Sequence, residues 1–253
     1  TDIVSIANLK NMMVVPLLSK ETNSLLGVND KLQLEETEQI YQSNNRKKFL
    51  RQGVTMLDSK SVFFKGDVEI GEDVEIEANV IFEGNVKLGD KVQIKSNTII
   101  KNAVISSGTE VKPYTIIEDS LVGKNCNIGP FARIRPNCTL EESVGIGNFV
   151  EVKASNIKKN TKANHLTYLG DSDIGENVNV GAGVITCNYD GVNKHKTVIK
   201  DNVFIGSDSQ LIAPIIVEEG VTIAAGSTIT DNSEKDSLLI ARSRQQEKKN
   251  WKR

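Results

Sequence analysis

The stretch "VEIGEDVEIEANVIFEGNVKLGDKVQIKSNTIIKNA", residues 68–103, repeats a short pattern every six residues. Apolar residues occupy the same place in each repeat, at Ile70, Ile76, Phe82, Leu88, Ile94 and Ile100. A β-branched residue stands two positions before each of them, at Val68, Val74, Val80, Val86, Val92 and Thr98. Turn-forming Gly, Asp, Asn or Ser fill most of the remaining positions. An apolar pair spaced by two and followed by a turn is typical of a very short strand with one face inward.

The same register returns near the end of the chain, at Ile199, Ile205, Leu211, Val217, Ile223 and Ile229. Between the two blocks it continues with occasional shifts of one residue, as at Ile128, Ile134, Leu140, Ile146 and Val152. A period of six fits neither an α-helix nor a heptad. Sustained hexapeptides predict a parallel β-helix, in which each coil covers the hydrophobic face of its neighbour. With three hexapeptides in each coil, residues 68–230 allow about nine coils of a triangular prism.

Residues 1–67 lack this repeat. The segment "MMVVPLL", residues 12–18, predicts a short buried strand that ends near Pro16. Asp30 with Gln33 predicts a capping box, and "KLQLEETEQIYQSNNRKKFLRQ", residues 31–52, has the composition of a helix. Apolar contacts are expected from this helix at Leu34, Ile40, Tyr41, Phe49 and Leu50. The fold class is therefore all-β, a β-helix of hexapeptide repeats with a short N-terminal segment and a linker α-helix.

Composition excludes several classes of function. The 31 basic and 33 acidic residues nearly balance, so neither nucleic acid nor a membrane surface is an expected partner. No segment approaches the roughly 18 apolar residues of a membrane span, and "TDIVSIANLK" lacks the order of a signal peptide. Three cysteines, Cys126, Cys138 and Cys187, have neither an even count nor metal-ligand spacing. We expect reduced, buried thiols in a cytoplasmic protein.

Five further strings carry a resemblance to a known family. They occur in the order "GPFARIRP" (129–136), "GNFVEVK" (147–153), "KANHLTYLGD" (162–171), "NVGAGVITCNYDGVNKHKT" (179–197) and "FIGSDSQLIAP" (204–214). Together they resemble the C-terminal half of the bacterial bifunctional N-acetylglucosamine-1-phosphate uridyltransferase/glucosamine-1-phosphate acetyltransferases. The string "LLGVNDKLQLEETEQIYQ" (25–42) resembles the end of the uridyltransferase domain and its linker helix. The resemblance implies a left-handed coil and covers nearly the whole chain.

The resemblance also implies a division of the chain. Residues 1–30 would be a remnant of the uridyltransferase domain, and residues 31–67 the linker helix and entry segment. Residues 68–230 would form the acetyltransferase domain, and residues 231–253 a tail that completes the coenzyme A site. The glycine-rich nucleotide loop of the family is not found in this chain, so uridyltransferase activity is not expected from it. Asn29, in "GVND", matches an asparagine that helps to hold Mg²⁺ in that domain, and Mg²⁺ is expected only there.

The implied reaction moves an acetyl group from acetyl-CoA to the amine of glucosamine-1-phosphate. Its product would supply UDP-N-acetylglucosamine, peptidoglycan and lipopolysaccharide synthesis. The reaction needs a base for the amine proton and donors for the thioester oxyanion. His165 matches the catalytic histidine of the family, whereas His195 lacks a match and is expected to be a loop or surface residue. Glu151 is a weaker candidate for orienting His165 or the amine, and a structural role for Glu151 stays open.

Further positions match the substrate contacts of the family. Arg135 and Lys153 match its phosphate-binding pair, an arginine fork and a lysine point charge. Tyr168 and Asn179 match residues that fix the sugar, with Tyr168 directed toward the phosphate. Asn188 and Tyr189 match contacts to sugar and coenzyme and would lie in an inserted loop. Thr186 to Ile199 is 13 residues, one more than two hexapeptides.

The coenzyme contacts follow from the same resemblance. The backbone amide of Ala182 would face the acetyl carbonyl and stabilise the oxyanion. Ser207 and Ala225 match positions that line the pantetheine arm, and Arg242 matches the arginine that meets the coenzyme phosphates. The family usually has Ser-Arg-Val-Pro around this arginine, whereas residues 241–244 here are Ala-Arg-Ser-Arg. Arg244 therefore becomes a second cation that could compete for those phosphates.

Prisms of this kind commonly form trimers, and the family builds its active site between subunits, so a homotrimer is expected. Two other functions compete with this interpretation. A non-catalytic repeat scaffold would keep the aliphatic register but would need no group of His165, Lys153 and Asn188. A hydratase of the γ-class carbonic anhydrase type needs three histidine ligands to zinc, and this chain has two histidines.

Overall fold

The computed structural model describes residues 2–18 and 26–252 and divides into two units, residues 1–44 and 45–253. Residues 1, 19–25 and 253, parts of the expected segments 1–30 and 231–253, lie outside the described residues. The first unit holds helix α1 (Asp2–Leu9), which the sequence did not predict, and the start of helix α2 (Lys31–Arg51). The strand expected at residues 12–18 is wrong, because this segment is irregular and exposed. A strand needs partners for its backbone groups, and no described strand pairs with this segment.

Helix α2 begins as the capping box predicts, with one difference. The backbone N–H of Gln33 donates to Asp30 Oδ1 at 2.8 Å. The Gln33 side chain accepts in return from the N–H of Asn29, at 2.7 Å, and not from that of Asp30. Among the expected apolar contacts Phe49 is buried and Ile40 half-buried, but Leu34, Tyr41 and Leu50 are exposed. Within the described ranges, neither helix has the length and apolar content to cross a membrane.

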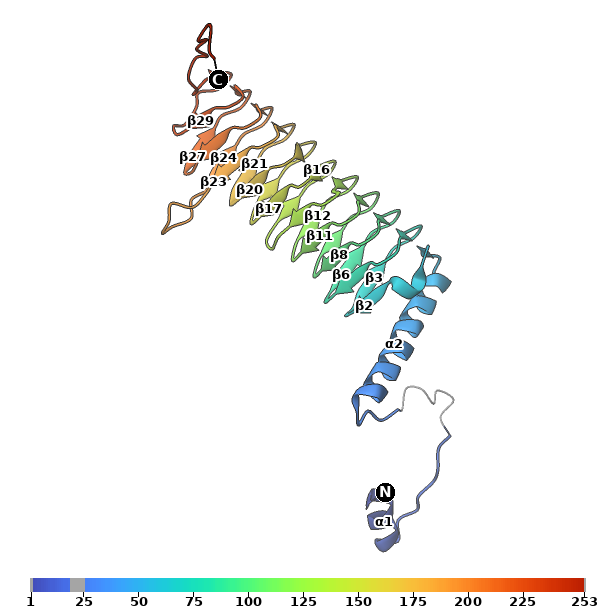
Figure 1. The fold of residues 1–253 in the computed structure, drawn as a ribbon. Coiled ribbons are helices and arrows are strands. Elements are labelled where there is room, and N and C mark those ends of the chain that lie inside the picture. Colours follow the sequence, from blue (N-terminus) through green and yellow to red (C-terminus); the bar gives the residue numbers. More distant parts are fainter. Residues whose placement is uncertain (1, 19–25, 253) are drawn as a thin grey trace. The chain divides into compact units, whose positions relative to one another are not determined.

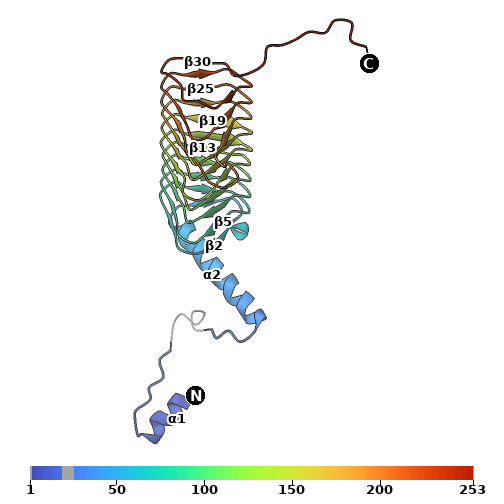
Figure 2. The ribbon, with the colours of Figure 1, turned by 90° about the vertical axis from the view of Figure 1, so that its left-hand side faces the viewer.

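The second unit is a left-handed parallel β-helix with three faces (Figures 1 and 2). Sheet A contains β1 (Thr55–Met56), β4 (Glu75–Ile76), β7 (Gln93–Ile94), β10 (Glu110–Val111), β13 (Asn127–Ile128), β16 (Gly145–Asn148), β19 (Lys162–His165), β22 (Asn179–Val180), β25 (Phe204–Ile205), β28 (Thr222–Ile223) and β30 (Leu238–Leu239). Sheet B contains β2 (Phe63–Lys65), β5 (Ile81–Glu83), β8 (Ile99–Lys101), β11 (Ile116–Glu118), β14 (Arg133–Ile134), β17 (Glu151–Lys153), β20 (Tyr168–Gly170), β23 (Ile185–Cys187), β26 (Gln210–Ile212) and β29 (Thr228–Ile229). Sheet C contains β3 (Val68–Ile70), β6 (Val86–Leu88), β9 (Val104–Ile105), β12 (Leu121–Val122), β15 (Thr139–Leu140), β18 (Asn156–Ile157), β21 (Ser172–Ile174), β24 (Thr197–Ile199) and β27 (Ile215–Val217).

The hexapeptide register forms the core, as predicted. Every strand pair within the three sheets is parallel, and partner strands follow one another at a nearly constant spacing along the chain, as in Ile116, Arg133 and Glu151. Of the register residues named from the sequence, all are buried except Ile70, which is half-buried. The strands extend beyond the expected range 68–230, from β1 at one end to β30 at the other.

The first coil of the prism has no preceding coil, and an aromatic stack covers its open end. Phe49 of α2 packs on Phe64 with ring centroids 4.9 Å apart, and Phe64 packs on Phe82 at 5.4 Å. The Nε of Arg46 donates to the carbonyl of Val62 at 3.0 Å. A terminal repeat must hide its apolar face, so the end of α2 acts as a cap as well as a linker.

An apolar edge runs along the corner between sheets A and B, formed by Tyr114, Phe131, Phe149 and Leu166. All four have positive φ, from 47° to 59°, although bulky residues rarely adopt this conformation. The rings of Tyr114 and Phe131 stack with centroids 4.9 Å apart, and those of Phe131 and Phe149 at 5.2 Å. Each of the four side chains is exposed, Phe131 by 46% and Leu166 by 61%. The corner therefore presents a continuous apolar ridge.

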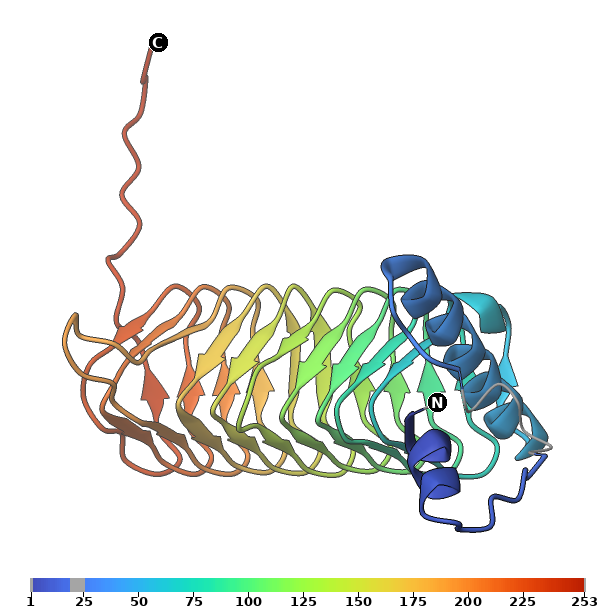
Figure 3. The same ribbon diagram turned by 90° about the horizontal axis from the view of Figure 1, so that it is seen from below.

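One coil is longer than the others. The strand partners Asn179 and Phe204 lie 25 residues apart, whereas partners in the preceding coils are 17 or 18 apart. The extra residues form the loop 188–195, which leaves the wall of the prism (Figures 1 and 3). The expected insertion of one residue is wrong. Thr186 in β23 and Ile199 in β24 lie on adjacent faces, so without an insertion they would be about one hexapeptide apart. They are 13 residues apart, so the insertion is longer than one residue.

Candidate active site

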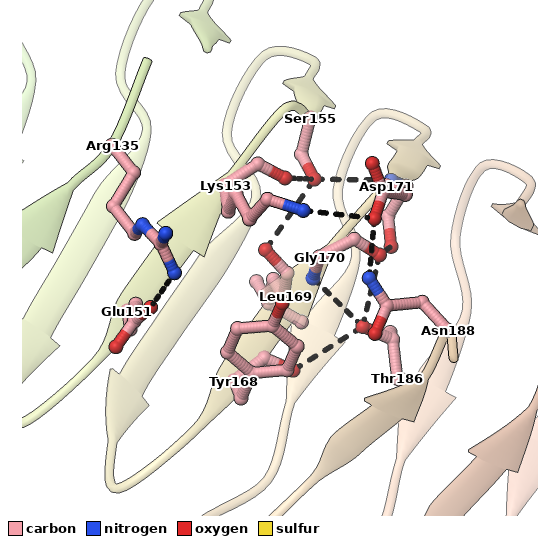
Figure 4. Close-up of polar contacts among 11 residues, drawn as sticks. Arg135, Glu151, Lys153, Ser155, Tyr168, Leu169, Gly170, Asp171, Thr186 and Asn188 are labelled. Carbon is pink, nitrogen blue, oxygen red and sulfur yellow. Dashed lines mark hydrogen bonds and ion pairs between the residues drawn. The ribbon is translucent and has the colours of Figure 1, made fainter. Parts of the chain in front are cut away.

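Neighbouring strands of sheet B place the predicted phosphate residues on one outward face. Val152 is fully buried, so alternation along β17 turns Glu151 and Lys153 outward. Arg135, just after β14, donates from Nη1 to Glu151 Oε1 at 2.7 Å (Figure 4). This hydrogen bond to Glu151 is the main reason that the pKa of Arg135 is raised. Because 37% of each side chain is exposed, a ligand can reach the pair.

Lys153 also joins a second polar group, one coil further along. Its Nζ lies 3.3 Å from Asp171 Oδ2, and Asn188 Nδ2 donates to the same oxygen (Figure 4). Lys194, on the loop 188–195, lies beside Lys153, and this neighbouring ammonium lowers the pKa of Lys194. The pKa of Lys153 is raised, because in its shared contact with Lys194 it is the lysine that pairs with the carboxylate of Asp171. This cationic cluster has three cations and two carboxylates, a set that suits a doubly charged phosphate: Arg135, Lys153, Lys194, Glu151 and Asp171.

Tyr168 lies along this face because the next outward residue of its strand has no side chain. A Cβ atom at Gly170 would overlap the ring of Tyr168, with the phenol oxygen as its nearest neighbour. Gly170 pairs in register with Lys153. The phenol of Tyr168 is therefore directed toward the cationic cluster.

His165 ends β19 at the corner between sheets A and B, and its side chain is exposed. Its Nδ1 lies 3.0 Å from Oδ1 of Asn148, its register partner in β16. An amide oxygen only accepts, so Nδ1 is the donor in this contact, and the neutral form of the ring has its lone pair on Nε2. Glu151 bonds to Arg135 and Asn148 contacts the ring, so the structure does not place Glu151 against His165. The other two expected roles of Glu151, orienting the substrate amine or a structural one, stay predictions.

The predicted coenzyme residues form a column along the same corner, beyond His165: Ala182, Ser207 and Ala225 on successive coils, with Arg242 beside the last. The residue that follows each of these three positions donates its N–H to a carbonyl of the preceding coil. For example, the N–H of Asp208 donates to the carbonyl of Ala182 at 2.7 Å. In the described chain, the N–H groups of Ala182, Ser207 and Ala225 have no acceptor. Two glycines, Gly181 and Gly206, flank the column. A Cβ atom at either position would come within 3.0 Å of the next coil. The wall is smooth here and offers free backbone donors.

Other predicted residues do not join these groups. Asn179 is exposed on sheet A, whereas the cationic cluster lies on sheet B. Tyr189 is 60% exposed, and its hydroxyl donates within the loop to the carbonyl of Gly191. The amide of Asn188 is buried and engaged with Asp171, so it anchors the loop. Asn29 donates from its side chain to Gln33, a local bond at the start of α2.

Three residues of these groups were not predicted from the sequence: Asn148, Asp171 and Lys194. Asn148 and Asp171 each lie one coil away from a residue that had been predicted, namely His165 and Lys153. The coil period of 17 or 18 residues is the signal that could have found them. Lys194 carries no such signal, because the loop leaves the register before reaching it.

Two family models match parts of the β-helix. The model described as "GMPPB C-terminal domain" matches residues 64–146. The model described as "Bacterial transferase hexapeptide (six repeats)" matches residues 196–231. His165, Lys153 and the loop 188–195 lie between the two matched ranges.

Several solved structures are similar to this chain. A UDP-N-acetylglucosamine acyltransferase of Francisella novicida is 18% identical, with a TM-score of 0.41, over 69% of this chain and 62% of that one. The corresponding enzyme of Bacteroides fragilis is 16% identical, with a TM-score of 0.42, over 72% and 70%. An N-acyltransferase of Bacillus cereus, solved with a dTDP-amino sugar and coenzyme A, is 18% identical, with a TM-score of 0.27, over 50% and 79%. The chain thus spans 62% of the length of the Francisella enzyme, and at these identities the likeness concerns the fold alone.

Proposed function

We propose that this chain transfers the acetyl group of acetyl-CoA to the amine of glucosamine-1-phosphate. The observation that carries the proposal is the position of His165 at the corner between sheets A and B, with the cationic cluster on the adjoining sheet B and the smooth column beyond His165 along the corner. A hexapeptide-transferase model matches part of the same β-helix, and the motifs around His165 resemble those of the acetyltransferases. A bare scaffold would need none of these polar groups.

The cationic cluster supports a sugar phosphate as acceptor. Arg135 offers a planar fork, and Lys153 and Lys194 offer point charges, so a phosphate could replace Glu151 and Asp171 as their partner. Tyr168 could donate its hydroxyl to the same phosphate. Binding through several charged bonds would fix the sugar with its amine toward the corner that holds His165.

The chemistry follows from the tautomer of His165. Nε2 would take a proton from the amine as the amine nitrogen attacks the thioester carbonyl carbon. The carbonyl oxygen gains negative charge, which the free N–H of Ala182 could stabilise. The C–S bond then breaks, and coenzyme A leaves as a thiol after taking the proton from the imidazolium. Asn148 keeps Nδ1 protonated throughout and so preserves the lone pair on Nε2.

The direct test is release of free coenzyme A with and without glucosamine-1-phosphate, at fixed acetyl-CoA. We expect release that depends on the sugar phosphate, and much weaker release with glucosamine, which lacks the phosphate that the cationic cluster would bind. Product identity would be checked by mass spectrometry for the acetylated sugar. Absence of sugar-dependent release from a folded sample would favour the scaffold and contradict the proposal.

A second copy of the chain is proposed to complete the site. Asn179 and the cationic cluster lie on different faces, so one chain cannot offer both to one sugar, while a neighbouring prism could. The apolar edge supports such packing, because exposed apolar ridges on proteins commonly mark interfaces. A closed trimer would repeat this contact three times.

Mixing two inactive variants tests the shared site. His165→Ala and Asn179→Ala chains, each nearly inactive alone, should regain about a quarter of wild-type activity when unfolded together and refolded as random trimers. The estimate holds because a working site would take His165 from one variant and Asn179 from the other. No recovery in trimers of confirmed mixed composition would mean that each site lies within one chain.

The proposed product would enter UDP-N-acetylglucosamine synthesis and serve peptidoglycan and lipopolysaccharide precursors, in the cytoplasm where acetyl-CoA is made. The uridyltransferase step that follows in the resembling family would need residues that this chain does not contain.

A further inference from the structure

The loop 188–195 is closed by bonds within itself. Tyr189 and Lys194 form an antiparallel bridge, and the N–H of His195 donates to the carbonyl of Asn188 at 2.8 Å. The N–H of Asp190 donates to Asn193 at 3.2 Å. The loop is therefore a short hairpin whose base is the anchored residue Asn188.

The carboxylate of Asp190 joins both sides of this hairpin. Its Oδ1 accepts from the N–H groups of Val192 and Asn193, at 2.8 and 2.6 Å. Its Oδ2 accepts from Nε2 of His195 at 2.7 Å. His195 was expected to be a simple loop or surface residue, and it does lie in the loop, but its ring is only 31% exposed and is committed to this pair.

The bonds fix the backbone on both sides of Lys194. The preceding residue, Asn193, accepts from Asp190, and the following residue, His195, donates to Asn188. The ammonium of Lys194 lies beside that of Lys153, a neighbour of like charge. Two ammonium groups repel, and the carboxylate of Asp171 offsets part of this repulsion, so a restraint on the loop backbone helps to keep Lys194 over the cationic cluster.

We propose that His195 and Asp190 form a clamp that positions Lys194 for phosphate binding. His195 is thus a positioning residue and does not touch the reacting atoms. The inference rests on the proposed function for its kinetic consequence, but the clamp itself is a property of the free loop. Holding both lysines in place before the substrate arrives lowers the cost of ordering them on binding.

Several charges surround the clamp. Lys194 and Lys196 flank His195 in the chain, and Lys196 is paired with Asp173 on β21. Lys153 in β17 and Asp171 just after β20 face Lys194.

The hydrogen bond from His195, followed by those from Asn193 and Val192, lowers the pKa of Asp190 to about 2. Because this folded pKa is below the ordinary value near 3.9, the clamp is intact above about pH 4 and is lost as the pH falls toward 2.

The kinetic test compares five variants. We expect His195→Ala to raise KM for glucosamine-1-phosphate about 10-fold, leaving kcat and KM for acetyl-CoA within about twofold. His195→Gln, which retains a donor for Asp190, should recover most of the loss. Val192→Ala is the matched control, because Val192 is 82% exposed at the tip of the same loop. If the clamp acts through Lys194, adding His195→Ala to Lys194→Ala should raise KM no further.

Amide hydrogen exchange tests the clamp without any reaction. The N–H groups of Val192 and Asn193 donate to Asp190, so they should exchange at least about 10-fold faster in His195→Ala than in wild type, and at the wild-type rate in His195→Gln. Fast exchange in the wild type would overturn the clamp. Slow exchange in an inactive wild type would instead count against the proposed function and leave the clamp in place. An additive rise of KM in the double variant would exclude the route through Lys194.

Discussion

Replacing His165 by alanine is expected to lower kcat of the acetyl transfer by about 100- to 10,000-fold, the usual contribution of a general base. Asn148 gives the physical reason, because its Oδ1 leaves Nδ1 of His165 as the donor and Nε2 as the acceptor of a proton. KM for both substrates should change little, because the ring contacts reacting atoms and no phosphate. The measurement is steady-state coenzyme A release by the purified wild-type and variant proteins.

The control for His165→Ala is Lys162→Ala, an exposed residue at the other end of β19 that should retain full activity. Because His165 is itself exposed, its removal should leave the thermal stability unchanged within a degree or two, and an unfolded variant would be recognised by circular dichroism. Undiminished kcat in a folded His165→Ala protein would exclude His165 as the base and would direct attention to a water molecule or to another chain.

The sequence predicted the fold well because the β-helix is a local repeat. Each inward residue, such as Ile134, packs on residues one coil away, and that spacing is visible in the chain itself. The segments that failed have no such support. Residues 12–18 are apolar enough for a strand, but they lack the neighbouring strand that a β-helix residue always has. The loop 188–195 leaves the repeat, so its length could not be read from a count of hexapeptides.

The candidate site was predictable in part for the same reason. Single residues such as His165 and Lys153 stand out by resemblance, but their partners depend on which residues face each other across coils. Glu151 lies closer to His165 in sequence than Asn148 does, yet the register pairs His165 with Asn148 and turns Glu151 to the next face. The hairpin bonds of His195 could not be predicted from the chain, since they depend on a loop conformation outside the repeat.

Two glycines of β16 permit a matched comparison of packing and activity. A Cβ atom at Gly147 would overlap the carbonyl oxygen of Asn164 and lie 2.5 Å from its carbonyl carbon. A Cβ atom at Gly145 would meet nothing nearer than 3.5 Å, which is ordinary contact. Both glycines are half-buried in the same strand, so the two substitutions add the same methyl group to nearly the same environment.

Gly147→Ala is therefore expected to lower kcat by about 100-fold, the effect of misplacing a catalytic group by about 1 Å. Backbone atoms cannot rotate away as a side chain can, so β16 and β19 must separate, and this pair of strands carries both Asn148 and His165. Overpacking should also cost about 1–3 kcal/mol of stability, or about 2–4 °C in Tm for each kcal/mol.

The control variant, Gly145→Ala, should keep wild-type kcat and Tm. If Gly147→Ala retains full kcat despite a lower Tm, the spacing of Asn148 and His165 does not control catalysis. Equal losses in both variants would show that any methyl group on this strand is harmful and that contact with Asn164 is not the cause.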